Sequence, residues 1–182
     1  MKLMIASDIH GSQFYCQQLL EAYGRESADR LLLLGDILYH GPRNNLPEEY
    51  APQKVIELLN GLKDSIFCVR GNCDTEVDQM VLDFPIMAEY CILPIGKNVI
   101  FATHGHKFNE KNLPPMHKGD ILLNGHTHIP ACTVYENYIY MNPGSASIPK
   151  NGSWHGYMIF DGLNFQWKDM SGKIQNEYKL SL

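Results

Sequence analysis

The chain has 182 residues, 45% of them hydrophobic, and its 20 acidic and 15 basic residues give a formal net charge of −5. This composition suits one compact domain over residues 1–182 and argues against a nucleic-acid polymer as partner, because such binding needs clustered Lys and Arg. No apolar run approaches the ~18 residues of a membrane span, so no membrane partner is expected. The five cysteines lack a CxxC pair, which indicates free thiols and a cytoplasmic protein.

The first half of the chain alternates strand patterns with helix patterns. Apolar runs predict strands over 2–7, 31–35 and 65–69. Near-helical spacing of apolar residues predicts helices over 12–23 and 52–62, the second of which opens with a proline. This order predicts parallel strands joined by right-handed crossovers.

Short strands dominate the second half, after Asp74. They are predicted over 87–93, 98–102, 120–124, 133–135, 138–141, 156–161 and 164–168, with turn signals such as Asp161-Gly162 between them. Such strands indicate an antiparallel or mixed sheet. The predicted class is therefore α/β, with two sheets favoured over one.

Five of the predicted strands are followed by a polar residue that can bind a metal. These residues are Asp8, Asp36, Asn72, His104 and His126. Since ligands bind at the carboxyl ends of parallel strands, we expect the five to converge on one crevice. Two of the ends carry a second candidate two positions later, His10 and His128. In an extended backbone, residues i and i+2 point to the same side, so each pair can present two ligands to one place.

Together these candidates provide two carboxylates, one amide and four imidazoles. A single His after a strand is more often an ordinary hydrogen-bonded residue, so the prediction depends on the conjunction. Seven ligands exceed the three or four of one catalytic zinc, and two ions would use them all if Asp36 bridges the ions. Mixed imidazole and carboxylate ligation suits Mn, Fe, Co, Ni or Zn, among which the residues do not select. We expect two divalent ions, with Mn²⁺ as the first choice.

The candidates also carry a family resemblance. The motifs are Asp8-Ile9-His10, Gly35-Asp36, Gly71-Asn72-Cys73-Asp74, His104-Gly105-His106 and Gly125-His126-Thr127-His128. Their ordered set resembles that of the calcineurin-like metallophosphoesterases. The segment Asn142-Pro143-Gly144-Ser145 is similar to a loop of the small, single-domain bacterial and archaeal phosphodiesterase branch, although a plain turn would explain it as well.

The resemblance implies a four-layer α/β/β/α sandwich of two mixed β-sheets flanked by helices. It also implies two sets of ligands that share Asp36: one metal on Asp8, His10, Asp36 and His128, and the other on Asp36, Asn72, His104 and His126. The implied activity is that of a metal-dependent phosphodiesterase, which hydrolyses a small phosphodiester by attack of a metal-bridging hydroxide on phosphorus. A homo-oligomer is compatible with the sequence.

The sequence departs from the usual family pattern at Cys73, where most members have a His that protonates the leaving group or contacts the phosphate. A thiol is a poor proton donor near neutrality, so we expect a preference for good leaving groups. With Asn72 and Asp74, Cys73 completes the motif predicted to be catalytic. His106 is predicted either to contact substrate or to meet a supporting carboxylate, and Arg43 either to bind a phosphate oxygen or to be simply exposed.

Two other interpretations remain open. The retromer scaffold subunit resembles this fold and uses it for protein contacts with an altered metal site, so a non-catalytic protein-binding scaffold is the alternative function. Metal ions that serve only folding are a third interpretation, which Asn72 disfavours because an amide is an unusual ligand in a purely structural site. Intact ligand motifs favour the hydrolase.

Overall fold

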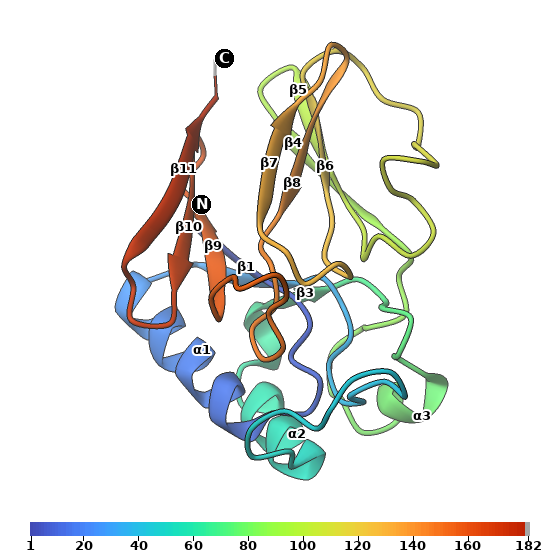
Figure 1. Cartoon of the computed structure of the whole chain (residues 1–182), viewed down its shortest axis with the longest axis vertical. Helices are drawn as coiled ribbons and strands as arrows, with labels where there is room; N and C mark the ends of the chain where they lie inside the picture. The colour runs from blue at the N-terminus through green and yellow to red at the C-terminus, as the bar shows by residue number, and fades with distance from the viewer. Residues whose placement is uncertain (181–182) are drawn as a thin grey trace.

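The computed structural model describes residues 1–180 and shows two β-sheets packed face to face, with the helices gathered on one side (Figure 1). The six-stranded sheet has the order β11-β10-β9-β1-β2-β3. Its strands are β1 (Leu3–Ala6), β2 (Arg30–Leu33), β3 (Ile66–Cys68), β9 (Gly156–Phe160), β10 (Asn164–Asp169) and β11 (Ile174–Lys179). As predicted, β1, β2 and β3 pair in parallel.

The five-stranded sheet has the order β4-β5-β6-β8-β7. Its strands are β4 (Cys91–Ile95), β5 (Asn98–Ala102), β6 (Asp120–Leu123), β7 (Ala131–Val134) and β8 (Tyr138–Asn142). The pairs β5–β6 and β6–β8 are parallel, whereas β4–β5 and β7–β8 are antiparallel. Both sheets are therefore mixed, and the predicted α/β class with two mixed sheets is confirmed.

The helices are α1 (Gln13–Glu26), α2 (Pro52–Asn60), the 3-10 turn η1 (Lys63–Ser65) and the short α3 (Glu76–Gln79). Helix α1 begins after Ser12, whose hydroxyl accepts a hydrogen bond from the Tyr15 backbone N–H, as an N-cap should. Helix α2 begins at Pro52, where the missing N–H costs no helical bond. No helix among residues 1–180 is long and apolar enough to span a membrane.

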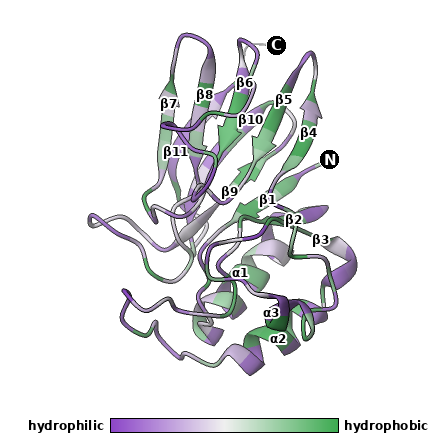
Figure 2. Ribbon diagram, turned by 90° about the vertical axis from the view of Figure 1, so that its right-hand side faces the viewer, coloured by the Kyte–Doolittle hydropathy of each residue, from purple (hydrophilic) through white to green (hydrophobic). Residues whose placement is uncertain are grey.

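Hydrophobic residues fill both faces of the six-stranded sheet. In β2, Leu31 and Leu33 pack toward the helices, whereas Leu32 and the following Leu34 pack between the sheets. This alternation explains the run of four leucines, since a strand buried on both faces needs no polar positions. In Figure 2, β5 and β6 are largely hydrophobic, whereas the helices carry both kinds of residue.

The outer face of the five-stranded sheet has no helix among the described residues. It is covered by the segment 103–119, whose Phe108 and Met116 pack on Phe101, Leu122, Tyr138 and Tyr140. This segment contains Pro114-Pro115 and a glycine with a φ of 113° at position 105, which disfavour a helix. The fourth layer of the sandwich is thus irregular.

Two strand predictions needed adjustment. Strand β4 begins at Cys91, whereas a strand from residue 87 was predicted. The carbonyl oxygen of Ala88 accepts a hydrogen bond from the Arg70 backbone N–H, so this segment is tied to the loop after β3 and does not pair in the sheet. Strand β11 was not predicted, because its mostly exposed polar residues lack the apolar alternation of a half-buried strand.

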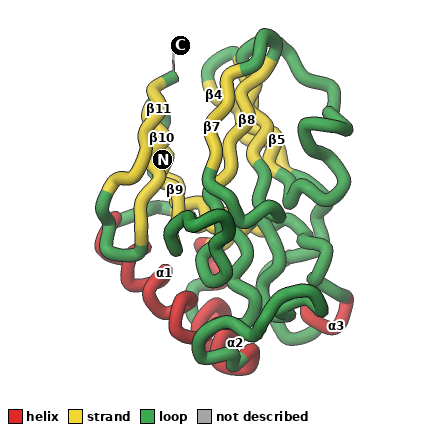
Figure 3. The backbone as a smooth tube through the Cα atoms, viewed as in Figure 1, coloured by secondary structure: helices red, strands yellow, loops and turns green. Residues whose placement is uncertain are grey.

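Long loops follow the strands at the end of the molecule where the two sheets and the helices meet (Figure 3). They are held together by backbone hydrogen bonds, such as Asp8 N–H to Gly35 O at 3.1 Å and Gly125 N–H to His104 O at 2.8 Å. The fold therefore brings the residues that follow β1, β2, β3, β5 and β6 into one place.

Candidate metal centre

All seven candidate metal ligands lie in this loop cluster. Asp8 and His10 follow β1, Asp36 follows β2, Asn72 follows β3, His104 follows β5, and His126 and His128 follow β6. Asp8, His10, Asp36, His104 and His128 are almost completely buried. The expected convergence of five strand ends is what the structure shows, while the role of these residues as ligands stays a prediction.

The backbone that presents them is left-handed and not extended. Eight described non-glycine residues have positive φ, and five of these are candidate ligands: Asp8, His10, Asp36, His126 and His128. Each i and i+2 pair was predicted to converge because an extended backbone would turn both side chains to one side. The backbone is not extended, so that reason was wrong. The pairs do converge, but through backbone conformations that cost about 1 kcal/mol or more per residue and that cluster at functional sites.

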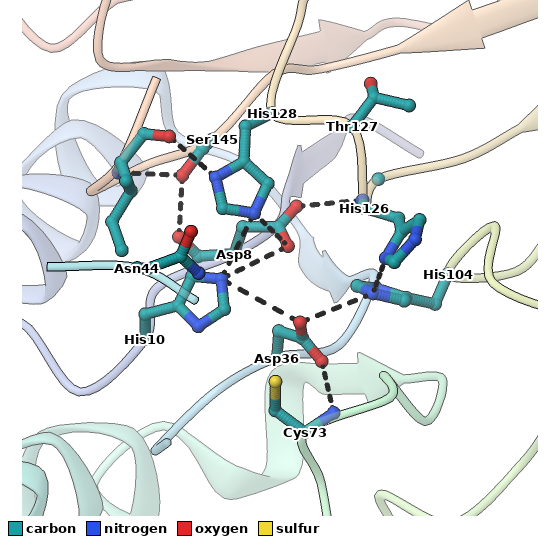
Figure 4. Close-up of polar contacts among 12 residues, drawn as sticks. Asp8, His10, Asp36, Asn44, Cys73, His104, His126, Thr127, His128 and Ser145 are labelled. Atoms are coloured by element: carbon teal, nitrogen blue, oxygen red, sulfur yellow. Dashed lines mark hydrogen bonds and ion pairs between the residues drawn. The ribbon is translucent and has the colours of Figure 1, made fainter. Parts of the chain in front are cut away.

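The first group consists of Asp8, His10 and His128 (Figure 4). Asp8 Oδ1 lies 3.2 Å from His128 Nε2 and 3.5 Å from His10 Nε2. The two imidazoles are oriented from behind, because His10 Nδ1–H donates to Tyr39 O at 2.7 Å and His128 Nδ1–H donates to Ile148 O at 2.6 Å. These bonds assign the tautomer that turns the Nε2 lone pairs toward the centre.

The second group consists of Asp36, Asn72, His104 and His126. His104 Nε2 lies 3.0 Å from Asn72 Oδ1, 3.1 Å from His126 Nδ1 and 3.4 Å from Asp36 Oδ2. Its Nδ1–H donates to Leu34 O at 2.7 Å, which again leaves Nε2 to face the centre.

Asp36 lies between the two groups. Its Oδ2 is 3.4 Å from His104 Nε2 on one side and 3.8 Å from His10 Nε2 on the other. Its Oδ1 accepts a hydrogen bond from the Cys73 backbone N–H at 2.8 Å, which orients the carboxylate. This is the position required of a ligand shared by two ions.

Two observations indicate that these residues suit divalent cations. Asp8 Oδ1 is buried and has no hydrogen-bond partner among the described residues, so a charged oxygen is left unsatisfied next to imidazoles. Three Nε2 lone pairs face carboxylate and amide oxygens, an arrangement of acceptors that needs a cation or extra protons between them. Oxygen and imidazole donors suit Mn, Fe, Co, Ni or Zn. The Cys73 sulfur also lies within 4.8 Å of ligand atoms of His10 and Asp36.

Charges around the centre shift the pKa values of its residues. Burial alone would raise the pKa of Asp8, but the imidazoles of His10 and His128 hold it well below its usual value. Burial alone would lower the pKa of His104, but Asp36 and Asp8 raise it to about 9. A site that stabilises anionic carboxylates and protonated imidazoles in this way is prepared to exchange those protons for metal ions.

Asp74 supports this centre from behind. Its Oδ2 accepts hydrogen bonds from the Asp36 N–H at 2.9 Å and the Gly71 N–H at 2.7 Å, and its Oδ1 accepts one from the Ile37 N–H at 2.9 Å. The carboxylate is buried and both oxygens are occupied by backbone donors. Asp74 was predicted to be catalytic, but this placement indicates a positioning residue that joins the loop of Asp36 to the loop of Asn72.

Cys73 and His106 lie at the edge of the centre. The Cys73 sulfur accepts a hydrogen bond from Asn72 Nδ2 at 3.2 Å, and burial together with the charge of Asp36 raises the pKa of the thiol. The ring centroid of His106 is 5.4 Å from that of His104, and its buried Nδ1 has no partner among residues 1–180. Burial and the neighbouring His104 lower the pKa of His106 to about 4, so it is neutral near pH 7.

The turn at 142–145 holds two ligand loops in place. Asn142 Nδ2 donates to Gly125 O at 2.7 Å, next to His126, and Ser145 Oγ donates to Asp8 O at 2.8 Å. From the sequence, this segment was either a loop shared with the phosphodiesterase branch or a plain turn. In the structure its side chains bind the backbone of the ligand loops.

An open cavity of about 430 Å³ lies over the centre. The candidate ligands Asp36, Asn72, His126 and His128 line it, as do Gly41, Pro42, Arg43, Asn44, Cys73, Thr127 and Lys150. Asn44 and Thr127, drawn with the candidate ligands in Figure 4, and Lys150 were not singled out from the sequence. No local signal marks Lys150, because only the fold brings it next to His128.

Comparison with known proteins agrees with this geometry. Residues 1–164 match the family model of the calcineurin-like phosphoesterase superfamily domain. The chain is 49% identical over 161 residues to phosphodiesterase YfcE of Escherichia coli K12, covering 88% of each protein. A solved structure of the E. coli phosphoesterase Yfce superposes with a TM-score of 0.96 over the whole of both chains, at 44% identity. Vacuolar protein sorting 29 of Cryptosporidium parvum shares the fold, with a TM-score of 0.62 at 18% identity over 98% of each chain.

Proposed function

Because the chain belongs to the calcineurin-like phosphoesterase superfamily, we propose that it is a binuclear metal-dependent phosphodiesterase acting on a small phosphodiester. The observation that carries the proposal is the position of Asp36 between two groups of candidate ligands, beneath an open cavity. Two divalent ions, with Mn²⁺ as our first choice, would supply an activated water and would stabilise negative charge on the phosphoryl oxygens.

The candidate ligands have distinct tasks in this proposal. Asp36 would hold both ions at a fixed separation, since its Oδ2 faces His10 and His104 and its Oδ1 is held by the Cys73 N–H. Backbone carbonyl groups keep the imidazoles of His10, His104 and His128 in the tautomer that can coordinate. Asn72 adds a neutral oxygen, which avoids additional negative charge close to an anionic substrate.

Protonation of the leaving group is the weak point of this centre. Burial and nearby carboxylates raise the pKa of Cys73, so the thiol keeps its proton near neutrality. His106 is neutral at that pH and lines a separate cavity of about 280 Å³ with Arg70 and Asn72, which suits a contact to substrate rather than delivery of a proton. The proposal therefore includes a preference for diesters whose alcohol or phenol leaves readily.

Substitution of the shared carboxylate tests the proposal. Asp36→Asn keeps the shape of the side chain but removes the charge that two ions would share. In buffer containing about 1 mM Mn²⁺, turnover of bis(4-nitrophenyl) phosphate should fall by roughly 10³-fold. The matched control is Asp64→Asn, an exposed carboxylate in η1.

Circular dichroism should show that both variants are folded. Full activity of Asp36→Asn under these conditions would refute the proposal.

A non-catalytic scaffold is the second candidate function, and the fold shared with vacuolar protein sorting 29 favours it. Against it stands the convergence of all seven candidate ligands, five of them buried, on one centre. Two tightly bound ions without turnover across a broad panel of phosphoesters would favour the scaffold, and metal-dependent turnover would exclude it as the sole function.

A further inference from the structure

The cavity over the metal centre carries two cationic side chains that the proposed chemistry does not use, Arg43 and Lys150. We propose that they form a subsite for a second anionic group of the substrate, a carboxylate or a phosphate separate from the phosphodiester that is cleaved. This inference rests on the proposed function and narrows its substrate class to diesters that carry an additional negative charge.

The backbone of Arg43 is held beside the centre by a turn. Gly41, Pro42, Arg43 and Asn44 form the turn, in which the Asn44 N–H donates to Gly41 O at 3.3 Å and proline occupies its preferred second position. Asn44 Nδ2 also donates to His40 O at 2.8 Å. A Cβ on Gly41 would lie 3.4 Å from the Cys73 sulfur, so the turn packs directly against the loop after β3.

The backbone of Lys150 is tied to a candidate ligand. Its N–H donates to His128 O at 3.1 Å, and its own carbonyl oxygen accepts hydrogen bonds from the Ser153 N–H at 3.0 Å and the Ser153 hydroxyl at 2.7 Å. The two cations thus come from loops far apart in sequence, each anchored next to the centre.

Among the described residues, neither cationic side chain is engaged by an acidic or hydrogen-bonding partner. Within residues 1–180, the side chains of Arg43 and Lys150 form no ion pair and no hydrogen bond, whereas Lys168 is paired with Glu26 and Lys54 with Glu57. In the part of the chain that the structure describes, the one carboxylate that lines the cavity is Asp36, which faces the other candidate metal ligands. In a chain with more acidic than basic residues, this rim is left cationic and free of competing acids.

The charge of the centre indicates what these cations are for. Two divalent ions with the carboxylates of Asp8 and Asp36 would carry a net charge of about +2, or about +1 once an activated hydroxide is counted, which is enough to balance the single negative charge of a phosphodiester. A simple diester would therefore leave Arg43 and Lys150 unneutralised. An additional carboxylate or phosphate would satisfy them, and arginine can bind either group through two hydrogen bonds.

The test compares 4-nitrophenyl phosphodiesters that share a leaving group and differ in the other substituent, which is 3-hydroxypropyl, 2-carboxyethyl or 2-phosphonoethyl. With the Mn²⁺-loaded protein, kcat/KM for at least one of the two anionic substrates should exceed that for the neutral one by about tenfold or more. The double variant Arg43→Gln, Lys150→Met should lose this preference and keep the neutral substrate within about twofold of its original rate. The loss should appear mainly in KM, and the preference should weaken at high salt.

Two comparisons make the result decisive. Lys179→Met, an exposed lysine on β11, serves as the control and should retain the preference. Calorimetric binding of propylphosphonate and 2-carboxyethylphosphonate gives a readout that needs no turnover, and the carboxylate should improve binding only when Arg43 and Lys150 are present. If the proposed activity fails, this binding difference still tests the subsite. No preference in the original chain, or a preference that survives the double variant, would overturn the inference.

Discussion

Replacement of Asp74 by asparagine tests how the protein positions its metal ligands. The Asp74 carboxylate accepts hydrogen bonds from the backbone N–H groups of Asp36, Ile37 and Gly71. These groups belong to the loops that carry Asp36 and Asn72. Asp74→Asn preserves the volume of the side chain but exchanges one oxygen for an NH₂ group, so the perturbation is confined to these hydrogen bonds.

The magnitude follows from the geometry. The best orientation of the amide keeps the two bonds that Asp74 Oδ2 now accepts and turns NH₂ toward the Ile37 N–H. One buried bond to a charged acceptor is then lost, at roughly 1.5–3 kcal/mol, and the two others lose their charge assistance, at about 0.5–1 kcal/mol each. We expect a loss of about 2.5–5 kcal/mol in the free energy of unfolding, against the roughly 5–15 kcal/mol by which a domain is typically stable.

The functional consequence concerns the ion predicted on Asn72. Once the bonds to Asp74 are weakened, the loops of Asp36 and Asn72 are no longer held at a fixed separation, so affinity for that ion should fall at least about tenfold. The affinity for the ion on Asp8, His10 and His128 should change less. Titration calorimetry with Mn²⁺ should resolve the two affinities, and urea denaturation of the metal-free protein gives the stability.

Asp120→Asn is the matched control. Asp120 is also buried, and it accepts hydrogen bonds from the Val99 N–H at 3.0 Å and the His117 N–H at 2.7 Å. It is the first residue of β6, at the end of that strand away from the centre. It should lower stability by a similar amount without changing either metal affinity. The positioning argument is wrong if Asp74→Asn binds both ions as tightly as the original chain, or if Asp120→Asn weakens them equally.

Three further predictions concern the leaving group, the ions and the stability. Cys73→His should speed hydrolysis of diesters with poor leaving groups by about tenfold or more and change good ones little, because an imidazole can supply the missing proton; unchanged rates across a series of substituted phenols would count against this. Removal of divalent ions with EDTA should lower the melting temperature by about 5–10 °C, since an ion at 100 times its Kd stabilises by about 2.7 kcal/mol, and a scan with and without Mn²⁺ would expose an error as an unchanged transition. Burial would raise the pKa of Glu26, but Lys168 and Tyr157 hold it below its ordinary 4.5, so its stabilisation is present above that pH and disappears as the pH falls through the lower, folded-state value. Glu26→Gln should therefore cost about 1–2 kcal/mol at pH 7 and progressively less below about pH 4, and urea titrations that show the same deficit at both pH values would contradict the assignment.

Apolar patterning was enough to predict most of the fold. The buried runs before Asp8 and Asp36 are short and strongly hydrophobic, and both form strands at nearly the predicted residues. The apolar pattern failed to predict strands where contacts between distant parts of the chain decide the local structure. Residues 87–90 were predicted to begin a strand, but the Ala88 carbonyl accepts a hydrogen bond from the Arg70 N–H and the segment joins no strand. Strand β11 is polar enough for a loop but pairs with β10 along its length.

The candidate ligands do lie together in the structure, although the reason given for their convergence was only partly right. The carboxyl ends of parallel strands do meet, which places Asp8, Asp36 and Asn72 together. The supporting groups were beyond the sequence: Tyr39 O, Ile148 O and Leu34 O, which orient three imidazoles, are backbone atoms that any residue would offer. Lys150 was equally hidden, because its neighbour His128 lies 22 positions earlier, before β7 and β8, and only the fold brings the two together.

The left-handed backbone of five candidate ligands bears on the chemistry of the centre. At a cost of about 1 kcal/mol or more per residue, the conformation would not persist in an unsupported loop. The support is visible in the hydrogen bonds from Ser145 and Ser147 to Asp8 O and in the Asp74 carboxylate under Asp36. Such bonds hold the ligand side chains close together before any ion binds, so the carboxylates and imidazoles face one another unsatisfied, as the buried Asp8 Oδ1 shows. Part of the folding energy is thereby used to preorganise the centre, and metal ions bound there would recover it by satisfying the carboxylates and imidazoles. Loss of the ions should therefore lower the free energy of unfolding, and loss of Asp74 should lower the metal affinity, because folding and metal binding depend on the same ligand arrangement.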